Sequence, residues 1–238
     1  MTDRLASTSP SKAARVAGFG YLIIIVSGIF AHFFVRSGMI VPGDATTTAG
    51  NILASEWLFR VGIASDLVMM ICDVVVALAL YVLLRPVSRS IALLAAWFRL
   101  IQTAINGVNL LNLFFVLLLL SGAGYLAVFE QDQLHALSLL FLNAHTHGVL
   151  IGQVFFGFHC LVLGYLVYRS GYIRRTLGIL LVFASAGYLT ESFGNLLSPQ
   201  NAEVFSYIVA VPAVVAELSL CLWLLIKGAK IPEIGRGA

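Results

Sequence analysis

Charged residues are scarce in this chain. They make up 11% of its 238 residues, whereas a soluble domain carries about 25%. Hydrophobic residues account for 60% and gather in long blocks, so lipid rather than water is the expected solvent. The net charge of +3 is not grouped into a basic stripe, and nucleic acid is therefore not an expected partner.

Cysteines and metal-ligand motifs are also nearly absent. The three cysteines, Cys72, Cys160 and Cys221, are odd in number and lie inside apolar blocks. We therefore expect these cysteines to be small packing residues and not part of a disulfide framework. No HExxH or comparable motif occurs, and the sequence predicts no cofactor.

Six apolar blocks are long enough to cross a bilayer, which takes about 20 residues of α-helix. They cover residues 14–36, 57–84, 91–120, 143–168, 175–197 and 203–227. None shows the alternation of a barrel strand, and an open sheet cannot satisfy its backbone in lipid. We therefore predict an all-α, polytopic membrane bundle of about six helices. Residues 14–227 form its transmembrane domain, between a disordered tail at 1–13 and a second tail at 228–238.

The basic residues are distributed on one side of this arrangement. Eleven of the fourteen lie before the first block, between blocks two and three, between blocks four and five, or after the sixth. The alternate loops hold mostly acids, with Arg36 as their one basic residue. The positive-inside rule then places both termini and both tails in the cytoplasm.

Two segments on the opposite side predict short helices. Pro42 and Gly43 turn the chain, and Asp44 or a following threonine can cap a short helix that leads into the second span. In "EQDQLHALSLLF", Leu134 and Phe141 belong to an apolar repeat at three and four. This segment is either an amphipathic surface helix or an extension of the fourth span.

The third block carries a regular polar stripe. Arg99, Gln102, Asn106 and Asn109 recur at three, four and three, which places them on one helix face. They either line a site or form hydrogen bonds between helices. Polar residues in other blocks fall at similar depths, so the candidate ligand- or cavity-lining residues are Asp66, Asp73, Arg99, Gln102, Asn106, Asn109, His159, Glu191 and Glu217.

Four of these residues are acids, whereas Arg99 is the one deep base. We expect Arg99 to pair with Asp73 or Glu217. The remaining acids must be protonated, solvated or paired, because an unpaired carboxylate is costly in a dry core. The bundle interior is therefore predicted to be a polar, net-acidic cavity that opens to the outside.

Three histidines lie near the outer ends of their blocks: His32, His145 and His147. Together with an acid they are an alternative metal site, and His32 with one of the others is an alternative haem site. For His145 and His147 an interfacial role is favoured. His159 is about 21 Å from His145 along the helix, so these two cannot share one metal.

Several short motifs resemble a known family. They are "IVPGD" at 40–44, "FRLIQ" at 98–102, "NLLNLF" at 109–114, "FFGFHCLVLGYL" at 155–166 and "GYL" at 187–189. They are similar to a family of bacterial multi-pass membrane proteins described as a domain of unknown function, over about residues 12–228. The resemblance implies a bacterial plasma-membrane protein and implies no activity, so no catalytic residue is assigned.

Three classes of function follow from these observations. The leading hypothesis is a cavity that binds or moves a cation, a proton or a small solute. The alternatives are an intramembrane metal-dependent hydrolase and a structural or partner-binding protein without chemistry. Expected partners are the lipid bilayer, a cation or small-molecule ligand and, if it forms a homo-oligomer, a second copy of the chain.

Overall fold

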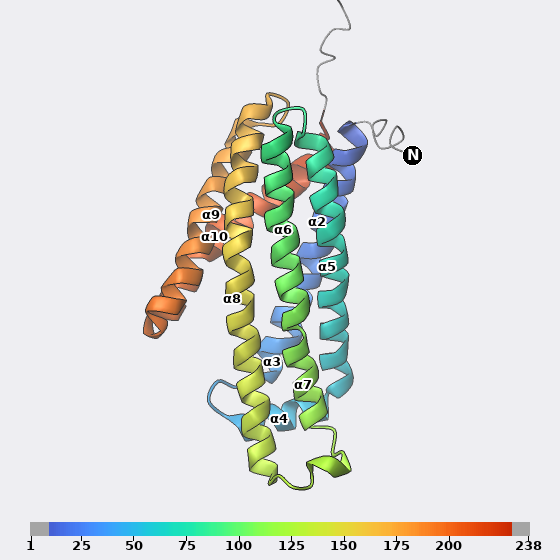
Figure 1. Cartoon of the computed structure of the whole chain (residues 1–238), viewed down its shortest axis with the longest axis vertical. Helices are drawn as coiled ribbons and strands as arrows, with labels where there is room; N and C mark the ends of the chain where they lie inside the picture. Colours follow the sequence, from blue (N-terminus) through green and yellow to red (C-terminus); the bar gives the residue numbers. More distant parts are fainter. Residues whose placement is uncertain (1–9, 230–238) are drawn as a thin grey trace, which may run out of the picture. The chain divides into compact units, whose positions relative to one another are not determined.

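The computed structural model describes residues 10–229, and these are helical almost throughout (Figure 1). The long helices are α2 (Pro10–Ile29), α5 (Glu56–Leu84), α6 (Arg89–Asn109), α8 (Gln131–Ser170), α9 (Arg175–Leu197) and α10 (Ala202–Ile226). Shorter elements connect or extend them: η1 (Phe30–Arg36), α3 (Ser37–Met39), α4 (Ala45–Ala54), α7 (Leu111–Leu119), η2 (Gly124–Leu126) and η3 (Pro199–Asn201).

Six candidate membrane spans are found in the described residues, as the hydrophobic blocks predict. They are Ser11–Met39, Glu56–Leu84, Arg89–Leu119, Gln131–Ser170, Arg175–Leu197 and Pro199–Ile226. Their mean hydropathy lies between 1.4 and 2.8. The chain is therefore an all-α, multi-pass membrane protein by the length and composition of its helices.

The ends of two helices differ from the predicted blocks. The fourth span is one helix of 40 residues, α8, so the segment "EQDQLHALSLLF" extends that span and is not a separate surface helix. Helix α2 begins at Pro10, and proline suits a first helical position because its missing N–H has no partner there in any case. Residues 10–13 of the predicted first tail are thus helical. The rest of the predicted first tail lies outside the described residues.

The described residues divide into two compact units. Unit 1 consists of residues 10–22, 72–102 and 153–229, and unit 2 consists of residues 23–71 and 103–152. Helices α2, α5, α6 and α8 contribute residues to both units, whereas α9 and α10 belong to unit 1.

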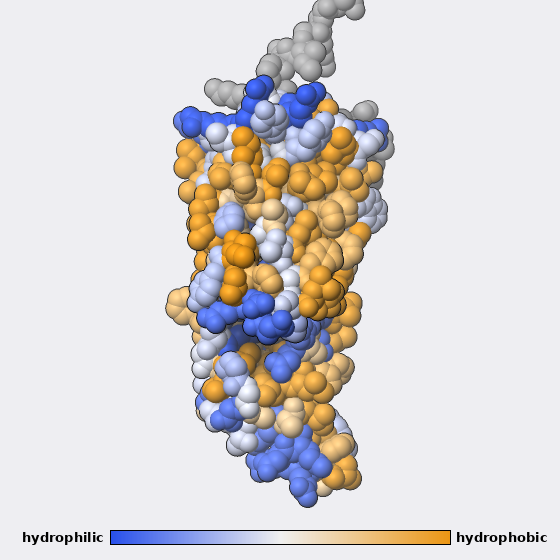
Figure 2. Space-filling model, turned by 90° about the vertical axis from the view of Figure 1, so that its left-hand side faces the viewer, coloured by the Kyte–Doolittle hydropathy of each residue, from blue (hydrophilic) through white to orange (hydrophobic). Residues whose placement is uncertain are grey.

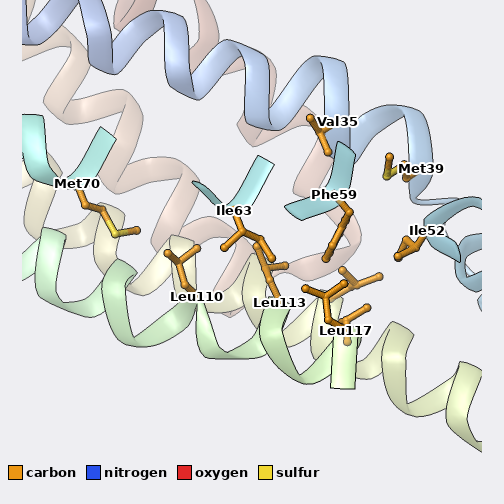
Figure 3. Packing of buried hydrophobic residues seen from close by; sticks show 11 residues of the cluster. Val35, Met39, Ile52, Phe59, Ile63, Met70, Leu110, Leu113 and Leu117 are labelled. Carbon is orange, nitrogen blue, oxygen red and sulfur yellow. The ribbon is translucent and has the colours of Figure 1, made fainter. Parts of the chain in front are cut away.

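Unit 2 is built around an apolar cluster (Figure 3). Phe59 and Ile63 of α5 face Leu113 and Leu117 of α7, and Val35 of η1 packs into the same cluster. Ile52 of α4 is fully buried against it. Burial of such side chains stabilises a fold by about 1.5–3 kcal/mol each in water, and in lipid their close packing takes over that role.

The short helix α4 is capped as predicted. Pro42 and Gly43 occupy a turn in which the Asp44 N–H donates to the Val41 carbonyl over 3.1 Å. Gly43 has a φ of 79°, which a residue without Cβ adopts without strain. The Asp44 carboxylate then accepts from the Thr47 N–H over 2.9 Å and from the Thr47 hydroxyl over 2.7 Å.

In unit 1, glycines allow the helix backbones to approach closely. A Cβ on Gly164 of α8 would lie 2.7 Å from the carbonyl oxygen of Gly178 of α9, and one on Gly178 would lie 2.6 Å from that of Gly164. Gly18 of α2 meets the backbone of Leu225 of α10 in the same way. Such contacts between small residues are a typical means of helix association in membranes.

Hydrophobic side chains cover much of the helix surface (Figure 2). Phe33, Phe34, Trp57, Phe183 and Leu197 are all more than half exposed. A soluble protein rarely exposes so much contiguous apolar surface, and lipid contact accounts for it.

Candidate functional site

The main polar site of unit 1 is centred on Arg99 of α6, whose side chain is 1% exposed. Its Nη2 donates to Asp73 Oδ1 of α5 over 2.5 Å, and its Nη1 donates to the Tyr21 hydroxyl of α2 over 3.0 Å. The same Nη1 lies 3.2 Å from His159 Nε2 of α8. These four residues are named the Arg99 cluster. The predicted pairing of Arg99 with Asp73 is confirmed.

The contacts of His159 fix its tautomer. Its Nδ1 lies 2.8 Å from the Ala95 carbonyl oxygen, and a carbonyl can only accept, so Nδ1 carries the proton. Nε2 then presents a lone pair to the Arg99 guanidinium, which can only donate. His159 is thus a neutral hydrogen-bond bridge between α6 and α8, and both of its ring nitrogens are already used within the protein.

A second polar pair of unit 1 joins Tyr188 of α9 to Glu217 of α10. The Tyr188 hydroxyl forms a short hydrogen bond with Glu217 Oε1. Both residues lie in unit 1, as the Arg99 cluster does. We name the two residues the Glu217 pair.

The ring of Phe156 lies between the two groups. It stacks on His159 at a centroid distance of 5.7 Å and meets Tyr188 edge-on at 5.1 Å. The Arg99 guanidinium carbon lies 5.4 Å from its centroid, within the range of a cation–π contact. The Arg99 cluster and the Glu217 pair thus form one neighbourhood to which α2, α5, α6, α8, α9 and α10 each contribute a polar side chain.

Two further predicted residues of unit 1 lie on its helices. Glu191 of α9 accepts from Gln153 Nε2 of α8 over 2.5 Å, so its partner is a neutral amide. Gln102 of α6 is 9% exposed, and within the described residues its buried Oε1 has no hydrogen-bond partner. A buried carbonyl oxygen without a donor is costly, and a ligand or water donor would relieve that cost.

Unit 2 holds its own ion pair. Arg36 of η1 donates through Nη1 to Asp66 Oδ2 of α5 over 2.5 Å and through Nη2 to Oδ1 over 3.3 Å. Asp66 is 4% exposed. η1 is a π-helical stretch, and such stretches shift the helix face that the following residues present. Arg36 lies within the first candidate span, Ser11–Met39, and not in the loop predicted for it.

Asn109 and His145 repair a break between α6 and α7. The Leu113 N–H bonds to the Leu110 carbonyl over 3.0 Å, which takes the Asn109 carbonyl out of the regular helix pattern. His145 Nδ1 lies 3.3 Å from that carbonyl oxygen, and the Asn109 amide donates to the His145 carbonyl over 2.8 Å. Asn112 in turn donates to Asn109 Oδ1 over 2.8 Å.

The structure corrects the interfacial role expected of His145, since this residue is 8% exposed and binds backbone. His147, by contrast, is exposed. Asp66 has Arg36 as its partner, so Arg99 is not the one deep base. The position of Arg36 at the end of an apolar block was a signal for this ion pair. The signal could be used only if the first helix was known to continue past residue 36.

Asn106 of α6 has a buried Oδ1 with no hydrogen-bond partner among the described residues. Cys160 of α8 is buried and free. Within residues 10–229 no three histidine, cysteine, aspartate or glutamate side chains form a group that could hold a metal ion. The contacts that the described site shows are hydrogen bonds and charge pairs, including the one between the Tyr188 hydroxyl and the Glu217 carboxyl group.

Comparison with known proteins agrees with the resemblance in the sequence motifs. Residues 16–228 match the family model "Domain of unknown function (DUF4386)". The chain is also similar to an uncharacterized protein of Archaeoglobus fulgidus, with 34% identity over 164 residues that cover 69% of this chain and 82% of the relative. No solved structure matches the chain.

Proposed function

The chain belongs to the DUF4386 family, a domain of unknown function, and from this premise we propose a function based on its own polar residues. We propose that the neighbourhood of the Arg99 cluster and the Glu217 pair binds and moves a proton or a small cation, with Glu217 as the group that gains and loses it. Gln102 supplies a further oxygen ligand for a bound solute or water in this proposal.

The observation that carries the proposal is the partner of Glu217. Asp73 has an arginine as its partner, so its charge is balanced at short range. Glu217 accepts from a neutral phenol and is the carboxylate of this neighbourhood that can take up a cation without breaking an ion pair. Ionisable residues inside spans are expensive and usually mark ion or proton pathways.

The proposal includes the orientation and location expected from the sequence. In unit 1 the described ends of α2 and α10 lie at the same end as the α5–α6 and α8–α9 loops (Figure 1). Basic residues such as Arg15, Arg89, Arg175 and Lys227 occur in these segments. We assign this end to the cytoplasm on the positive-inside rule, with both termini there and the helices in a bacterial plasma membrane.

The test measures proton flux in proteoliposomes with an enclosed pH-sensitive dye and an imposed pH gradient. Wild-type protein is expected to dissipate the gradient faster than protein-free liposomes, and Glu217→Gln is expected to abolish the difference. Glu203→Gln is the matched control, because Glu203 lies on the same helix and is exposed. The same liposomes with a potassium or sodium gradient distinguish a metal cation from a proton. Equal rates for wild type, Glu217→Gln and empty liposomes with every ion would refute the proposal.

A structural role is the second candidate, and the Arg99 cluster itself favours it. Arg99, Asp73 and His159 all have hydrogen-bond partners within the protein, as expected of residues that fix helix packing. This candidate predicts that Glu217→Gln lowers the thermal stability in detergent and leaves ion flux at the level of the control variant.

A further inference from the structure

An apolar groove of about 460 Å³ lies on the surface of unit 1. Ile91 of α6, Leu161 and Tyr165 of α8, and Ile179 and Val182 of α9 are among the residues that line it. Leu161, Tyr165, Ile179 and Val182 are each between 40% and 49% exposed. The groove therefore opens on the part of the surface that we assign to lipid.

The floor of the groove is set by Gly164 and Gly178, which both line it. The α8 and α9 backbones touch at these residues, and each glycine's missing Cβ would collide with the opposite carbonyl oxygen. Because the helices meet through glycines, no side chain fills the space above their crossing. The hollow is thus a consequence of helix packing, and an elongated apolar group can lie along it.

A positive charge lies at one end of the groove. Tyr168 lines the groove, and the guanidinium carbon of Arg175 lies 5.6 Å from the centroid of its ring. Arg175 is exposed, as are Arg169 and Arg174 in the same α8–α9 connection. Within residues 10–229 none of these three arginines forms an ion pair, and the first turn of α9 contains no acid.

We propose that this groove binds an anionic phospholipid, with one acyl chain along the groove and the phosphate on Arg175. The apolar walls match the acyl chain, and Arg175, which forms no ion pair within residues 10–229, matches the negative headgroup. Basic residues beside clefts between transmembrane helices are a known means of anionic lipid recognition. The ring of Tyr168 holds the guanidinium of Arg175 at the groove end, so the two halves of the lipid are recognised at adjoining positions.

The test compares binding of phosphatidylglycerol and phosphatidylcholine to the full chain in detergent, measured by native mass spectrometry. Wild-type protein is expected to retain phosphatidylglycerol in preference. Arg175→Gln is expected to reduce that preference roughly fivefold, the factor that corresponds to one arginine near an anionic lipid surface. Arg15→Gln is the matched control, because Arg15 is an exposed arginine of α2 outside the groove.

A second variant tests the groove separately from the charge. Ile179→Trp fills the groove and is expected to weaken retention of both lipids, with the preference between them unchanged. Arg175 and Ile179 are exposed, so both variants keep the buried packing of unit 1. Equal retention of the two lipids by wild type, or equal losses in Arg175→Gln and Arg15→Gln, would overturn the proposal. So would an Ile179→Trp variant that retains lipid and loses a dimer, because the occupant would then be a second copy of the chain.

Discussion

The two units use buried polar residues for different purposes. In unit 2, polar side chains lie where the helices are irregular: Arg36 ends the π-helical stretch η1, and Asn109 and His145 bind the backbone at the α6–α7 break. In unit 1, Asp73 and Glu217 lie within long helices and bind other side chains. In unit 2 Asn109 and His145 thus bind backbone groups at a helix break, whereas Asp73 and Glu217 of unit 1 bind only side chains in the contacts described above.

The largest expected effect tests whether the ion pair of unit 1 contributes more to the free energy of unfolding than the ion pair of unit 2. Arg99→Met leaves Asp73 buried without its partner, and we expect a loss of about 3–5 kcal/mol in the free energy of unfolding. Arg36→Met should cost less, because the Arg36 side chain is 14% exposed and that of Arg99 is 1% exposed. Denaturant unfolding in detergent measures both.

The matched control removes both charges of the unit 1 pair. Arg99→Met combined with Asp73→Leu should recover most of the loss, since apolar replacement of a buried ion pair is often neutral. If Arg36→Met costs as much as Arg99→Met, the proposed difference between the units fails.

A smaller effect tests the backbone repair in unit 2. A Cβ on Gly148 of α8 would lie 2.0 Å from Asn109 Oδ1, so Gly148→Ala must displace an amide that binds both His145 and Asn112. We expect a loss of about 1–3 kcal/mol, the range for overpacking. Thermal unfolding followed by circular dichroism measures it.

Gly50→Ala in α4 is the control for this prediction, because no atom lies within 4 Å of the added methyl. It should be neutral or stabilising by up to about 1 kcal/mol. Equal destabilisation by the two alanines would show that Asn109 does not require the glycine.

A hydrogen bond in unit 1 is expected to contribute about 1 kcal/mol to the free energy of unfolding, and this contribution should depend on pH. The Tyr172 hydroxyl, in the α8–α9 connection, donates to the Leu83 carbonyl over 2.7 Å. Burial raises the pKa of Tyr172 from the ordinary value of 10.0 to about 12. The unfolded chain therefore loses this proton first, so the stabilisation is complete below pH 10 and declines as the pH rises toward 12. Tyr172→Phe should be less stable at pH 8 and lack this part of the alkaline decline.

The smallest effect concerns Asp44, the cap of α4 in unit 2. Hydrogen bonds from Thr47 lower the pKa of the Asp44 carboxyl. The Asp44 carboxylate therefore stabilises α4 fully when the pH is above the ordinary pKa of a carboxyl group. This stabilisation is lost as the pH falls through the lowered pKa of the folded protein. The protection of the α4 amides against hydrogen exchange, taken relative to the intrinsic exchange rate at each pH, should therefore fall in acid for the wild type. Asp44→Asn keeps an acceptor at the cap, and exchange in α4 should then no longer show this pH dependence.

Much of the fold could be predicted from the sequence because lipid imposes strict rules on length and composition. The six spans follow from the apolar blocks, and the cap at Asp44 follows from local turn chemistry. Arg36 and His145 could not be placed correctly, because their environments depend on where one helix continues and another breaks. A stretch of seven π-helical residues leaves no composition signal of its own.

Apart from the pairing of Arg99 with Asp73, the candidate site was predictable as a set of depths and not as a set of contacts. Residue counting along the helices placed Asp73, His159 and Glu217 at similar levels, and the structure brings Asp73 and His159 to Arg99. The role of Tyr21 as a partner of Arg99 was missed, since a tyrosine in an apolar block is indistinguishable from a packing residue. The stripe from Arg99 to Asn109 predicted one shared face, but its members serve different partners.

The Asp73–Arg99 pair has a consequence for how the chain enters the membrane. A charged residue at the centre of a span costs about 2.5–3.5 kcal/mol at insertion, and this cost applies to Asp73 in α5 and to Arg99 in α6. The two helices are consecutive and are joined only by residues 85–88. They can therefore enter as a helical hairpin in which the aspartate and the arginine neutralise each other, before the later spans are synthesised. We therefore expect the ion pair to couple the insertion of the second span to that of the third.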